Sequence, residues 1–565
     1  MLGDHVVEFP TCERQKWKRD EIASKLAQAR EALAGGSSEV EVSERLNIPR
    51  STLRYWLSRK DHLDGSKNVA EFFESPDGLA LLHRIVMAMH FSVMYSSHGI
   101  RGVCTALERS GLSRFVASSY GAQQQVAEQV EEQMVAFGER QRAMQAQARA
   151  KGPERRISLV EDETFHPEPC LVGIEPESDF IVLETYAAQR NAETWNAEVE
   201  KALAGLNMRV VQSTSDEAKG ILAHVRAGLG AHHSPDLFHL QQDLARGVFS
   251  GLGRAIQQAR DDREVAAKLT VFWEGRLAES RAPGGSPKGR RSLEEARQRA
   301  VEAARVVEKL EAQHAHAKES LKAISTAYHP YDLTSGAARG VESLGQEIGG
   351  CMDRLRGIAA DLELGERALK SIDKARRLLP SLLATLTFVF TFILARVNEL
   401  DLSEEVKRTL HQQLIPAFYL QGAATKAPRA EQRKAIEAVA TRLLEPLRSA
   451  DSPLRSLDSE TFENVERVAR ECANIFQRSS SCVEGRNGQL ALHHHSLHKI
   501  RPRKLRALTV VHNYYRPSGP TPAERLFRTQ HEDLFTWLAD HVDLPARPAR
   551  KRPRPSIQPL LAAAA

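Results

Sequence analysis

Alternating apolar and polar positions mark one β-rich stretch in the chain. Three successive strands are predicted by the segments RISLVEDETF, PCLVGIEP and DFIVLETYA, and the short turns between them favour antiparallel pairing. The next residues are typical of a helix (AETWNAEVEKALAGL), a fourth strand (NMRVVQSTS), a second helix (DEAKGILAHVRAGLG) and a short fifth strand that enters a helix (HSPDLFHL). This stretch therefore predicts a mixed five-stranded sheet with helices on its faces.

The rest of the chain repeats its apolar residues every three or four positions, which is the pattern of helices. No strand pattern returns for about two hundred residues after residue 255, and there we expect an all-helical insertion. Its long charged helix is predicted to begin at a capping box formed by Ser292 and Glu295. Further helices are predicted over residues 338–376, 381–399, 403–415, 428–448 and 459–477.

A helix-turn-helix motif is predicted by SSEVEVSERLNIPRSTLRYWLSRK, residues 37–60, which contains a capped helix, a break at LNIP and a second helix. The second helix of such a motif offers its N-terminal residues to the major groove and buries its apolar face. Leu53, Trp56 and Leu57 are then expected in the core. The expected DNA contacts are Arg50, Ser51, Arg54 and Tyr55. Because the motif is short, a helical hairpin without a role in DNA binding is the alternative.

The composition is that of a soluble globular protein, with 42% hydrophobic and 27% charged residues. The 565 residues suffice for several domains. The net charge of +5 is modest, but the basic runs RQKWKR and ARPARKRPRP lie near the two ends, which suits contact with a polyanion. The six cysteines lack CxxC spacing and the first residues lack an apolar leader pattern, so we expect a cytoplasmic protein without a disulfide framework or zinc finger.

One segment, LLPSLLATLTFVFTFILARV, is apolar for almost the length of a membrane span. It contains Pro380 and several hydroxyl side chains, and charged helical patterns flank it on both sides. We therefore expect a buried helix of the helical insertion and no association with a membrane.

The predicted strand order is that of an RNase H-like fold, in which the first and fourth strands are neighbours. Asp162 lies at the end of the first strand and Asp216 directly follows the fourth, so their carboxylates would meet at one edge of the sheet. A third carboxylate would come from a helix after the fifth strand, and Glu484 is the candidate. Three carboxylates suit two Mg²⁺ (or Mn²⁺) ions, which promote attack on a phosphodiester by water or a 3′-hydroxyl.

Other carboxylates compete for these positions. Glu161 and Glu163 flank Asp162, but the alternation of a strand places both on the opposite face. Asp236 and Asp243 compete for the second position, where Asp216 is preferred because it directly follows a β-rich run.

The segments LVEDETF, STSDEAKGIL, PDLFHL and CVEGRNGQL, followed by VVHNYYRPSGPTPAERLF, resemble a bacterial DDE-type transposase of the insertion-sequence kind. The resemblance covers residues 155–255 and 470–530, and it implies that Asp162, Asp216 and Glu484 are the metal ligands. Asp236 and His239 match the D-x-x-H element of Mutator-like transposases, which implies that His239 lies beside the scissile phosphate. A helical insertion before the third acid is also found in those relatives and in hAT enzymes.

Together these patterns predict an α/β RNase H-like core interrupted by an all-α insertion and preceded by helical DNA-binding modules. The expected divisions are a helix-turn-helix domain at 1–65, a second helical module with a linker helix at 66–150, the first part of the core at 151–255, the insertion at 256–465, the last part of the core at 466–540, and a basic disordered tail at 541–565.

The expected function is DNA transposition by a homodimer or larger oligomer on the nucleoid. The enzyme would bind the ends of a mobile element, cleave phosphodiester bonds with Mg²⁺ or Mn²⁺, and transfer the 3′-hydroxyl strand into target DNA. Two alternatives stay open, a DNA-binding regulator that has lost catalysis and a metal-dependent nuclease without strand transfer.

Overall fold

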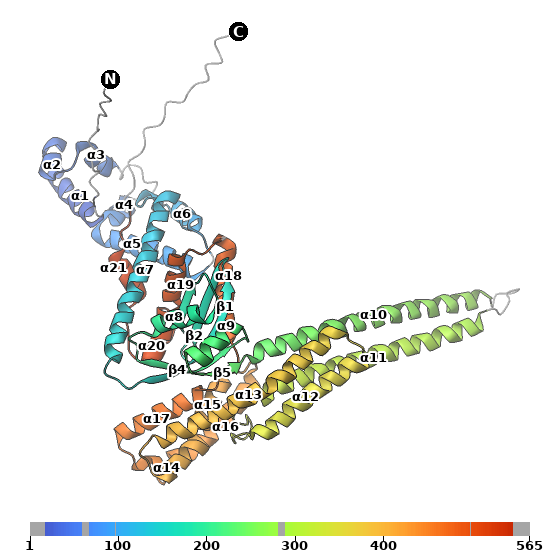
Figure 1. Cartoon of the computed structure of the whole chain (residues 1–565). Helices are drawn as coiled ribbons and strands as arrows, with labels where there is room; N and C mark the ends of the chain where they lie inside the picture. Colours follow the sequence, from blue (N-terminus) through green and yellow to red (C-terminus); the bar gives the residue numbers. More distant parts are fainter. Residues whose placement is uncertain are drawn as a thin grey trace, which may run out of the picture. The chain divides into compact units, whose positions relative to one another are not determined.

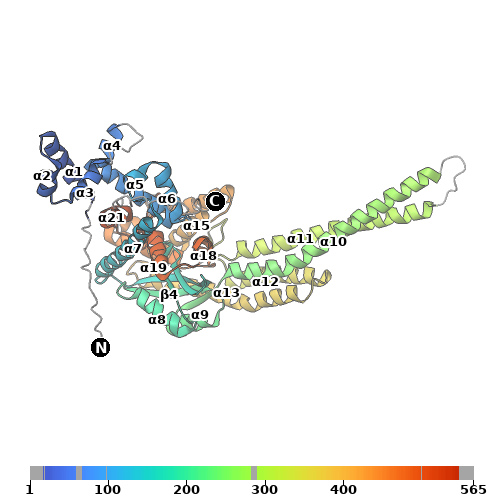
Figure 2. The same cartoon turned by 90° about the horizontal axis from the view of Figure 1, so that it is seen from above.

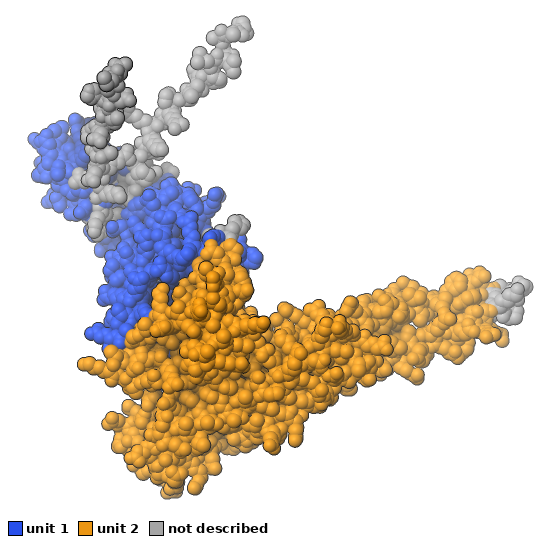
Figure 3. All heavy atoms as spheres, viewed as in Figure 1, with its two compact units in different colours: residues 1–148, 488–565 blue, residues 149–487 orange. Residues whose placement is uncertain are grey.

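The computed structural model describes residues 17, 19–58, 67–96, 98–280, 289–497 and 499–545. The chain divides into two compact units, unit 1 with residues 1–148 and 488–565 and unit 2 with residues 149–487 (Figure 3). Most of the predicted basic tail and of the run RQKWKR lies outside the described residues.

The β-rich stretch of unit 2 folds as a mixed sheet, as predicted. In the described part of the chain its strands are β1 (Arg155–Phe165), β2 (Pro169–Glu175), β3 (Phe180–Tyr186), β4 (Met208–Ser215) and β5 (His232–Pro235). The strands lie in the order β3-β2-β1-β4-β5. Figure 1 labels β1, β2, β4 and β5 of this sheet. β2 pairs antiparallel with β1 and β3, whereas β4 runs parallel to β1 and β5.

The two faces of the sheet are covered by different segments. Leu159 and Leu171 pack on one face against Trp195 and Ile221. The helices on this face are α8 (Ala192–Leu203), α9 (Lys219–Ala223) and the π-helical turn η2 (His224–Gly228). On the opposite face the Oγ of Ser158 donates to the carbonyl of Ile475 at 3.2 Å. The period-two alternation of β1 therefore directs Asp162 to the side of residues 475–487.

The helical insertion follows β5 directly and forms the largest hydrophobic core of unit 2. Its elements are α10 (Leu237–Ser280), α11 (Arg290–Ala327), α12 (Val341–Asp361), α13 (Glu366–Asn398), α14 (Glu404–Thr409), η3 (Leu410–Leu414), α15 (Ile415–Thr425), α16 (Ala430–Arg448), η4 (Pro453–Ser456) and α17 (Ser459–Asn474). α10 and α11 run side by side along most of their length (Figure 2).

Two boundaries predicted for these helices are wrong. The helix expected over 338–376 breaks at residues 362–365, where Glu363 and Gly365 adopt φ of 47° and 83°, a left-handed backbone that ends a helix. α13 then continues through Pro380 because its apolar face is buried on both sides of the proline, as at Leu378 and Leu382. The capping box of Ser292 is also absent, because α11 begins earlier, after Gly289.

α13 contains the apolar segment expected to be buried. Its Leu386, Val389 and Ile393 are buried in the core of the insertion, and α13 packs on α10, α12 and α17. Among the described residues, α13 and α5 (Pro76–Tyr95) are long and apolar enough to cross a membrane. This is weak evidence for a membrane span, since the core helix of a soluble protein passes the same test.

Unit 1 is helical in its described residues. Its elements are α1 (Arg19–Ala34), α2 (Glu39–Arg45), α3 (Arg50–Ser58), α4 (Lys67–Glu74), α5, α6 (Ile100–Arg109), η1 (Leu112–Arg114), α7 (Tyr120–Arg149), α19 (Pro502–Tyr514), α20 (Pro522–Phe527) and α21 (Leu534–His541). The boundary between the units falls within α18 (Ser481–Leu497).

Residues 488–540, which we expected to complete the sheet domain, are grouped with unit 1. The fully buried ring of Phe137 on α7 lies against Tyr514 of α19 and Trp537 of α21, with ring centroids 5.5 and 5.9 Å away. This aromatic cluster joins the C-terminal helices to the N-terminal ones.

Candidate functional site

The strand pairing brings Asp162 and Asp216 to the same edge of the sheet. In the parallel pair β1–β4, Val160 lies opposite Thr214. Asp162 is two residues further along β1, and Asp216 two residues beyond Thr214, directly after the last residue of β4. Asp216 thus follows the end of β4, whereas Asp162 lies inside β1, which continues to Phe165, and not at the strand's end as expected. Both residues lie just beyond the last paired residues of the two parallel strands, so their carboxylates belong to one edge of this pair, as the sequence predicts.

Three of the predicted site residues form a close cluster. One ligand atom each of Asp162, His239 and Glu484 lies within 4.8 Å of the other two, and all three residues are partly buried. The Nε2 of His239 is 3.5 Å from the Oε1 of Glu484 and 3.7 Å from the Oδ2 of Asp236. These residues come from β1, the first turn of α10 and the first turn of α18, so the fold assembles the cluster from distant segments.

Asp216 is not part of this three-residue cluster, but its charge acts on it. The pKa of Asp162 is raised to about 6, first by burial and then by the negative charges of Asp216 and Glu484. The backbone N–H of Glu163 and the imidazole of His239 act in the opposite direction. The site therefore concentrates negative charge on a carboxyl group that is poorly solvated.

Asn487 is a site residue that the sequence reasoning missed. Its Nδ2 donates to the Oδ2 of Asp162 at 3.0 Å, while the N–H of Glu163 donates to Oδ1 at 2.8 Å. The Oδ1 of Asn487 is buried without a hydrogen-bond partner in the described part of the chain. Its spacing of three residues from Glu484 places both on one face of α18, which is the signal that could have found it.

The competing carboxylates have other partners. Asp236 is buried; its Oδ1 accepts from the N–H of Phe238 at the start of α10, and its Oδ2 accepts from the N–H of Ser480 at 3.2 Å. Asp243 forms an ion pair with Lys374 at 2.6 Å. Asp236 thus ties the start of α10 to the segment that leads into α18.

Glu161 and Glu163 point away from Asp162, as the strand alternation predicts. The Oε1 of Glu161 lies 3.1 Å from the Nε2 of His224, with both side chains fully buried. Glu163 pairs with Arg190 at 2.8 Å and accepts from the indole N–H of Trp195 at 3.2 Å. Both glutamates therefore hold helices on the far face of the sheet.

A buried ion pair fixes the start of α18. The guanidinium of Arg486 donates from Nε and Nη2 to the two oxygens of Glu184 on β3, at 2.8 and 2.6 Å. Both side chains are almost completely buried. Such a bidentate pair sets the rotation of a helix about its axis, and Glu484 and Asn487 flank Arg486 in the sequence.

The predicted helix-turn-helix residues lie in unit 1. α2 and α3 flank the predicted break, and Ser38 and Glu41 form a capping box at α2. Leu53 and Trp56 are buried, and Leu57 packs against the same core. The expected DNA contacts are arranged as follows: Arg50 and Ser51 are exposed, Tyr55 is half-buried, and the exposed Arg54 pairs with Glu39 at 2.6 Å.

The comparison with known families gives one match. Residues 410–554 match a family of unknown function (DUF6399). The matched segment contains Glu484, Arg486 and Asn487 but neither Asp162 nor Asp216. No curated protein matches the chain.

Proposed function

We propose that the protein is a DDE-type transposase with an RNase H-like catalytic core. The strand order β3-β2-β1-β4-β5, with two antiparallel and two parallel pairings, supports this core. A helical insertion between β5 and the helix that carries the third acid agrees with the layout of Mutator-like and hAT relatives.

The observation that carries the proposal is the meeting of Asp162, His239 and Glu484 beside Asp216. Asp162 and Glu484 are separated by the whole helical insertion, and yet their oxygens lie within 4.8 Å of each other. Structural acids normally have a basic or hydrogen-bonding partner, as Glu184 has in Arg486. Asp162 has hydrogen-bond donors but no basic partner of this kind, and its raised pKa beside two further carboxylates is typical of a functional site.

The residues present fit a divalent cation. Asp162, Asp216 and Glu484 would hold it, since carboxylate oxygens are the ligands that Mg²⁺ and Mn²⁺ prefer. The buried Oδ1 of Asn487, which has no partner in the described part of the chain, adds a neutral oxygen beside them. When bound, Mg²⁺ or Mn²⁺ would supply positive charge to activate the attacking oxygen and to stabilise the leaving oxygen at phosphorus.

The chain's own residues position the reacting groups. Asn487 and the N–H of Glu163 hold the two oxygens of Asp162, so this carboxylate keeps one orientation. His239 lies between Asp236 and Glu484, where its ring can donate a hydrogen bond to a phosphate oxygen of the DNA.

The element ends would be bound through the helix-turn-helix by Arg50, Ser51, Arg54 and Tyr55. The enzyme would act on the nucleoid as a homodimer or larger oligomer, because transposition holds two DNA ends together.

A cleavage assay tests the proposal. A labelled DNA fragment carrying the sequences that flank the gene is incubated with Mg²⁺ or Mn²⁺, and nicking and strand joining are scored separately. The intact protein should do both. Asp162→Ala, Asp216→Ala and Glu484→Ala should each lower the cleavage rate by at least about a thousandfold, as expected when a group that acts only in the transition state is removed, with DNA binding unchanged.

The two alternatives give different results in the same assay. Nicking without joining would identify a nuclease, and binding without nicking would identify a regulator. Cleavage that persists in one of the three variants would exclude that acid from the site.

A further inference from the structure

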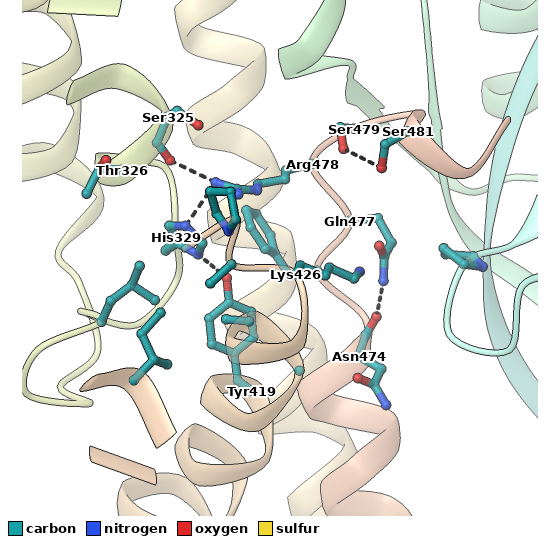
Figure 4. A pocket seen from close by; sticks show the side chains of 18 of the residues that line it. Ser325, Thr326, His329, Tyr419, Lys426, Asn474, Gln477, Arg478, Ser479 and Ser481 are labelled. Carbon is teal, nitrogen blue, oxygen red and sulfur yellow. Dashed lines mark hydrogen bonds between the residues drawn. The ribbon is translucent and has the colours of Figure 1, made fainter. Parts of the chain in front are cut away.

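A second polar site lies in unit 2, where the insertion meets residues 475–482. It is a cavity of about 530 Å³, within the range of small-molecule sites. Its walls come from the end of α11, from α15, α16 and α17, and from the segment that leads into α18 (Figure 4). None of Asp162, His239 and Glu484 lines it, so it is distinct from the acidic cluster.

The lining is cationic. Lys322, Lys426 and Arg478 line the cavity, and the described lining residues include no aspartate or glutamate. Lys426 is exposed, and its ammonium makes no hydrogen bond or ion pair with the described residues. Partial desolvation lowers its pKa, whereas Glu175 and Glu177 raise it from outside the lining. Both oxygens of Glu175 already accept hydrogen bonds from its own turn. Three cationic side chains that line one cavity without an acidic residue among the described lining are a feature of an anion site.

Arg478 is held in place by a neutral histidine. Its Nη1 donates to the carbonyl of Ser325 at 2.7 Å and to the Nε2 of His329 at 2.9 Å (Figure 4). Burial and the charge of Arg478 lower the pKa of His329 to about 3, so its Nδ1 carries the proton and donates to the hydroxyl of Tyr419 at 2.5 Å. The Nε and Nη2 of Arg478 have no partner among the described residues and remain available to a ligand.

We propose that this cavity binds a small phosphorylated organic molecule. A phosphate carries up to two negative charges and three acceptor oxygens, which suits the guanidinium fork of Arg478 together with two lysines. Hydroxyl side chains also line the cavity, among them Ser481. The lining includes the apolar side chains of Leu333 and Ile436 as well, which suits the organic part of the ligand.

We favour a free small molecule over a phosphate group of a DNA strand as the ligand. Segments that are far apart in the sequence line the cavity, and its volume has room for a ligand of about the size of a nucleotide. The sequence contains no GxxxxGK[ST] motif, so the proposal is binding and includes no hydrolysis. It does not depend on the transposase proposal, since no residue of the acidic cluster takes part.

Calorimetric titration of the full chain tests this site with ADP, inorganic pyrophosphate, adenosine and a 5′-phosphorylated tetranucleotide. ADP and pyrophosphate should bind, and adenosine should not. Lys426→Ala should weaken ADP binding by about 10- to 100-fold, the loss expected for one hydrogen bond to a charged group. Lys434→Ala, an exposed lysine on α16 outside the lining, is the matched control and should bind ADP like the wild type.

Asp162→Ala should also bind ADP normally, which separates this site from the cleavage site. The proposal is overturned if neither ADP nor pyrophosphate binds, or if Lys426→Ala binds ADP unchanged. It is equally overturned if the tetranucleotide binds through Lys426 while the two small phosphates do not. The ammonium of Lys426 makes no hydrogen bond with the described residues, so its replacement should leave the thermal unfolding midpoint unchanged.

Discussion

The carboxyl group of Asp162, which is a metal ligand in the proposed function, lowers the stability of the folded protein when it is ionised. Its pKa is raised to about 6, whereas an aspartate in an unfolded chain ionises near about pH 4. The folded protein therefore binds this proton more tightly than the unfolded chain. In metal-free protein, ionisation of this carboxyl should therefore lower the free energy of unfolding as the pH rises from about 4 to about 6. At higher pH the free energy of unfolding should stay lower by the same full amount.

We therefore predict that Asp162→Asn raises the unfolding temperature of metal-free protein at about pH 7.5, by about 1 °C for each kcal/mol by which the substitution stabilises the folded state. The difference from the wild type should vanish near about pH 4, where the native carboxyl is also neutral. Thermal unfolding in EDTA at the two pH values measures this. Glu217→Gln, which removes an exposed charge beside Asp216, is the control and should not depend on pH.

Added Mn²⁺ provides the converse check. A cation that binds only the folded state stabilises it by mass action, so Mn²⁺ should raise the unfolding temperature of the wild type at about pH 7.5 more than that of Asp162→Asn. Equal shifts in both proteins, or a stability difference that is the same at both pH values, would contradict the role assigned to Asp162.

For single residues, the sequence predicts the side-chain directions of strand residues better than the side-chain contacts of helix residues. The alternation of β1 correctly separates Asp162 from Glu161 and Glu163, because side-chain direction in a strand depends only on position. The role of Asn487 could not be predicted in the same way. Its hydrogen bond to Asp162 joins residues separated by the entire insertion, and only the packing of α18 brings them together.

At the scale of elements, α18 is placed by the buried pair of Arg486 and Glu184. We predict that Arg486→Met destabilises the protein by about 3–5 kcal/mol, because it leaves the buried Glu184 carboxylate without its guanidinium. The double variant Glu184→Leu, Arg486→Met should regain most of this stability. Urea-induced unfolding of the single and double variants measures both effects.

The matched control is Glu366→Gln, which breaks the exposed pair of Glu366 and Lys370. It should change the free energy of unfolding by less than about 0.5 kcal/mol. If Arg486→Met changed the free energy of unfolding as little as Glu366→Gln, the pair of Arg486 and Glu184 would not fix the position of α18. The position of Glu484 would then need another explanation.

The helix-turn-helix leads to a prediction about competing charges. Glu39 lies 2.6 Å from Arg54 and 3.8 Å from Arg50, so it neutralises two of the expected DNA contacts in the free protein. Glu39→Ala should therefore tighten DNA binding. Arg54→Ala should weaken it and lower the slope of log K against log salt by about 1. Fluorescence anisotropy with the flanking DNA at several salt concentrations gives both quantities.

Arg109→Ala, at the end of α6, removes the same charge outside the motif and serves as the control. The role of α3 in DNA binding would be refuted if Arg54→Ala and Arg109→Ala weakened binding equally.

The helix boundaries show why glycine, proline and capping residues in the sequence predicted the ends of the helices only in part. Gly365 is visible in the sequence and ends the break before α13, but the predicted boundary lies between residues 376 and 381, beside Pro380, where a proline removes a backbone hydrogen bond. Burial of the apolar face of α13 outweighs that local loss. Ser292 has the residues of a capping box, and yet α11 begins two residues earlier, because the chain turns at Gly289 with φ of 120°.

At the scale of the whole molecule, the order of the sheet follows from local patterns, whereas the division into units does not. Five strand segments with short connections allow few arrangements, so the sheet could be predicted. The grouping of residues 488–540 with the N-terminal helices depends on contacts such as that of Phe137 with Tyr514, between residues far apart in the sequence.

The pair of α10 and α11 carries the last prediction. Among the described residues, four large apolar side chains on these helices are more than half exposed: Val265 by 65%, Val271 by 68%, Phe272 by 54% and Val301 by 64%. Soluble monomers rarely expose such side chains in groups, and a partner that covers them gains about 25 cal/mol for each Å² of apolar surface removed from water. The proposed transposition would require two copies at paired DNA ends, so we expect this partner to be a second copy of the chain.

Sedimentation velocity of the full chain should therefore show a dimer at micromolar concentration. The double variant Val271→Lys, Phe272→Lys should shift it to the monomer, since two charges cannot be buried in an apolar contact without partners. Leu394→Lys, which charges an exposed leucine on α13, should leave the dimer intact. A wild type that is monomeric under these conditions, or a dimer that survives the double variant, would mean that the exposed residues of α10 and α11 do not form the contact between copies.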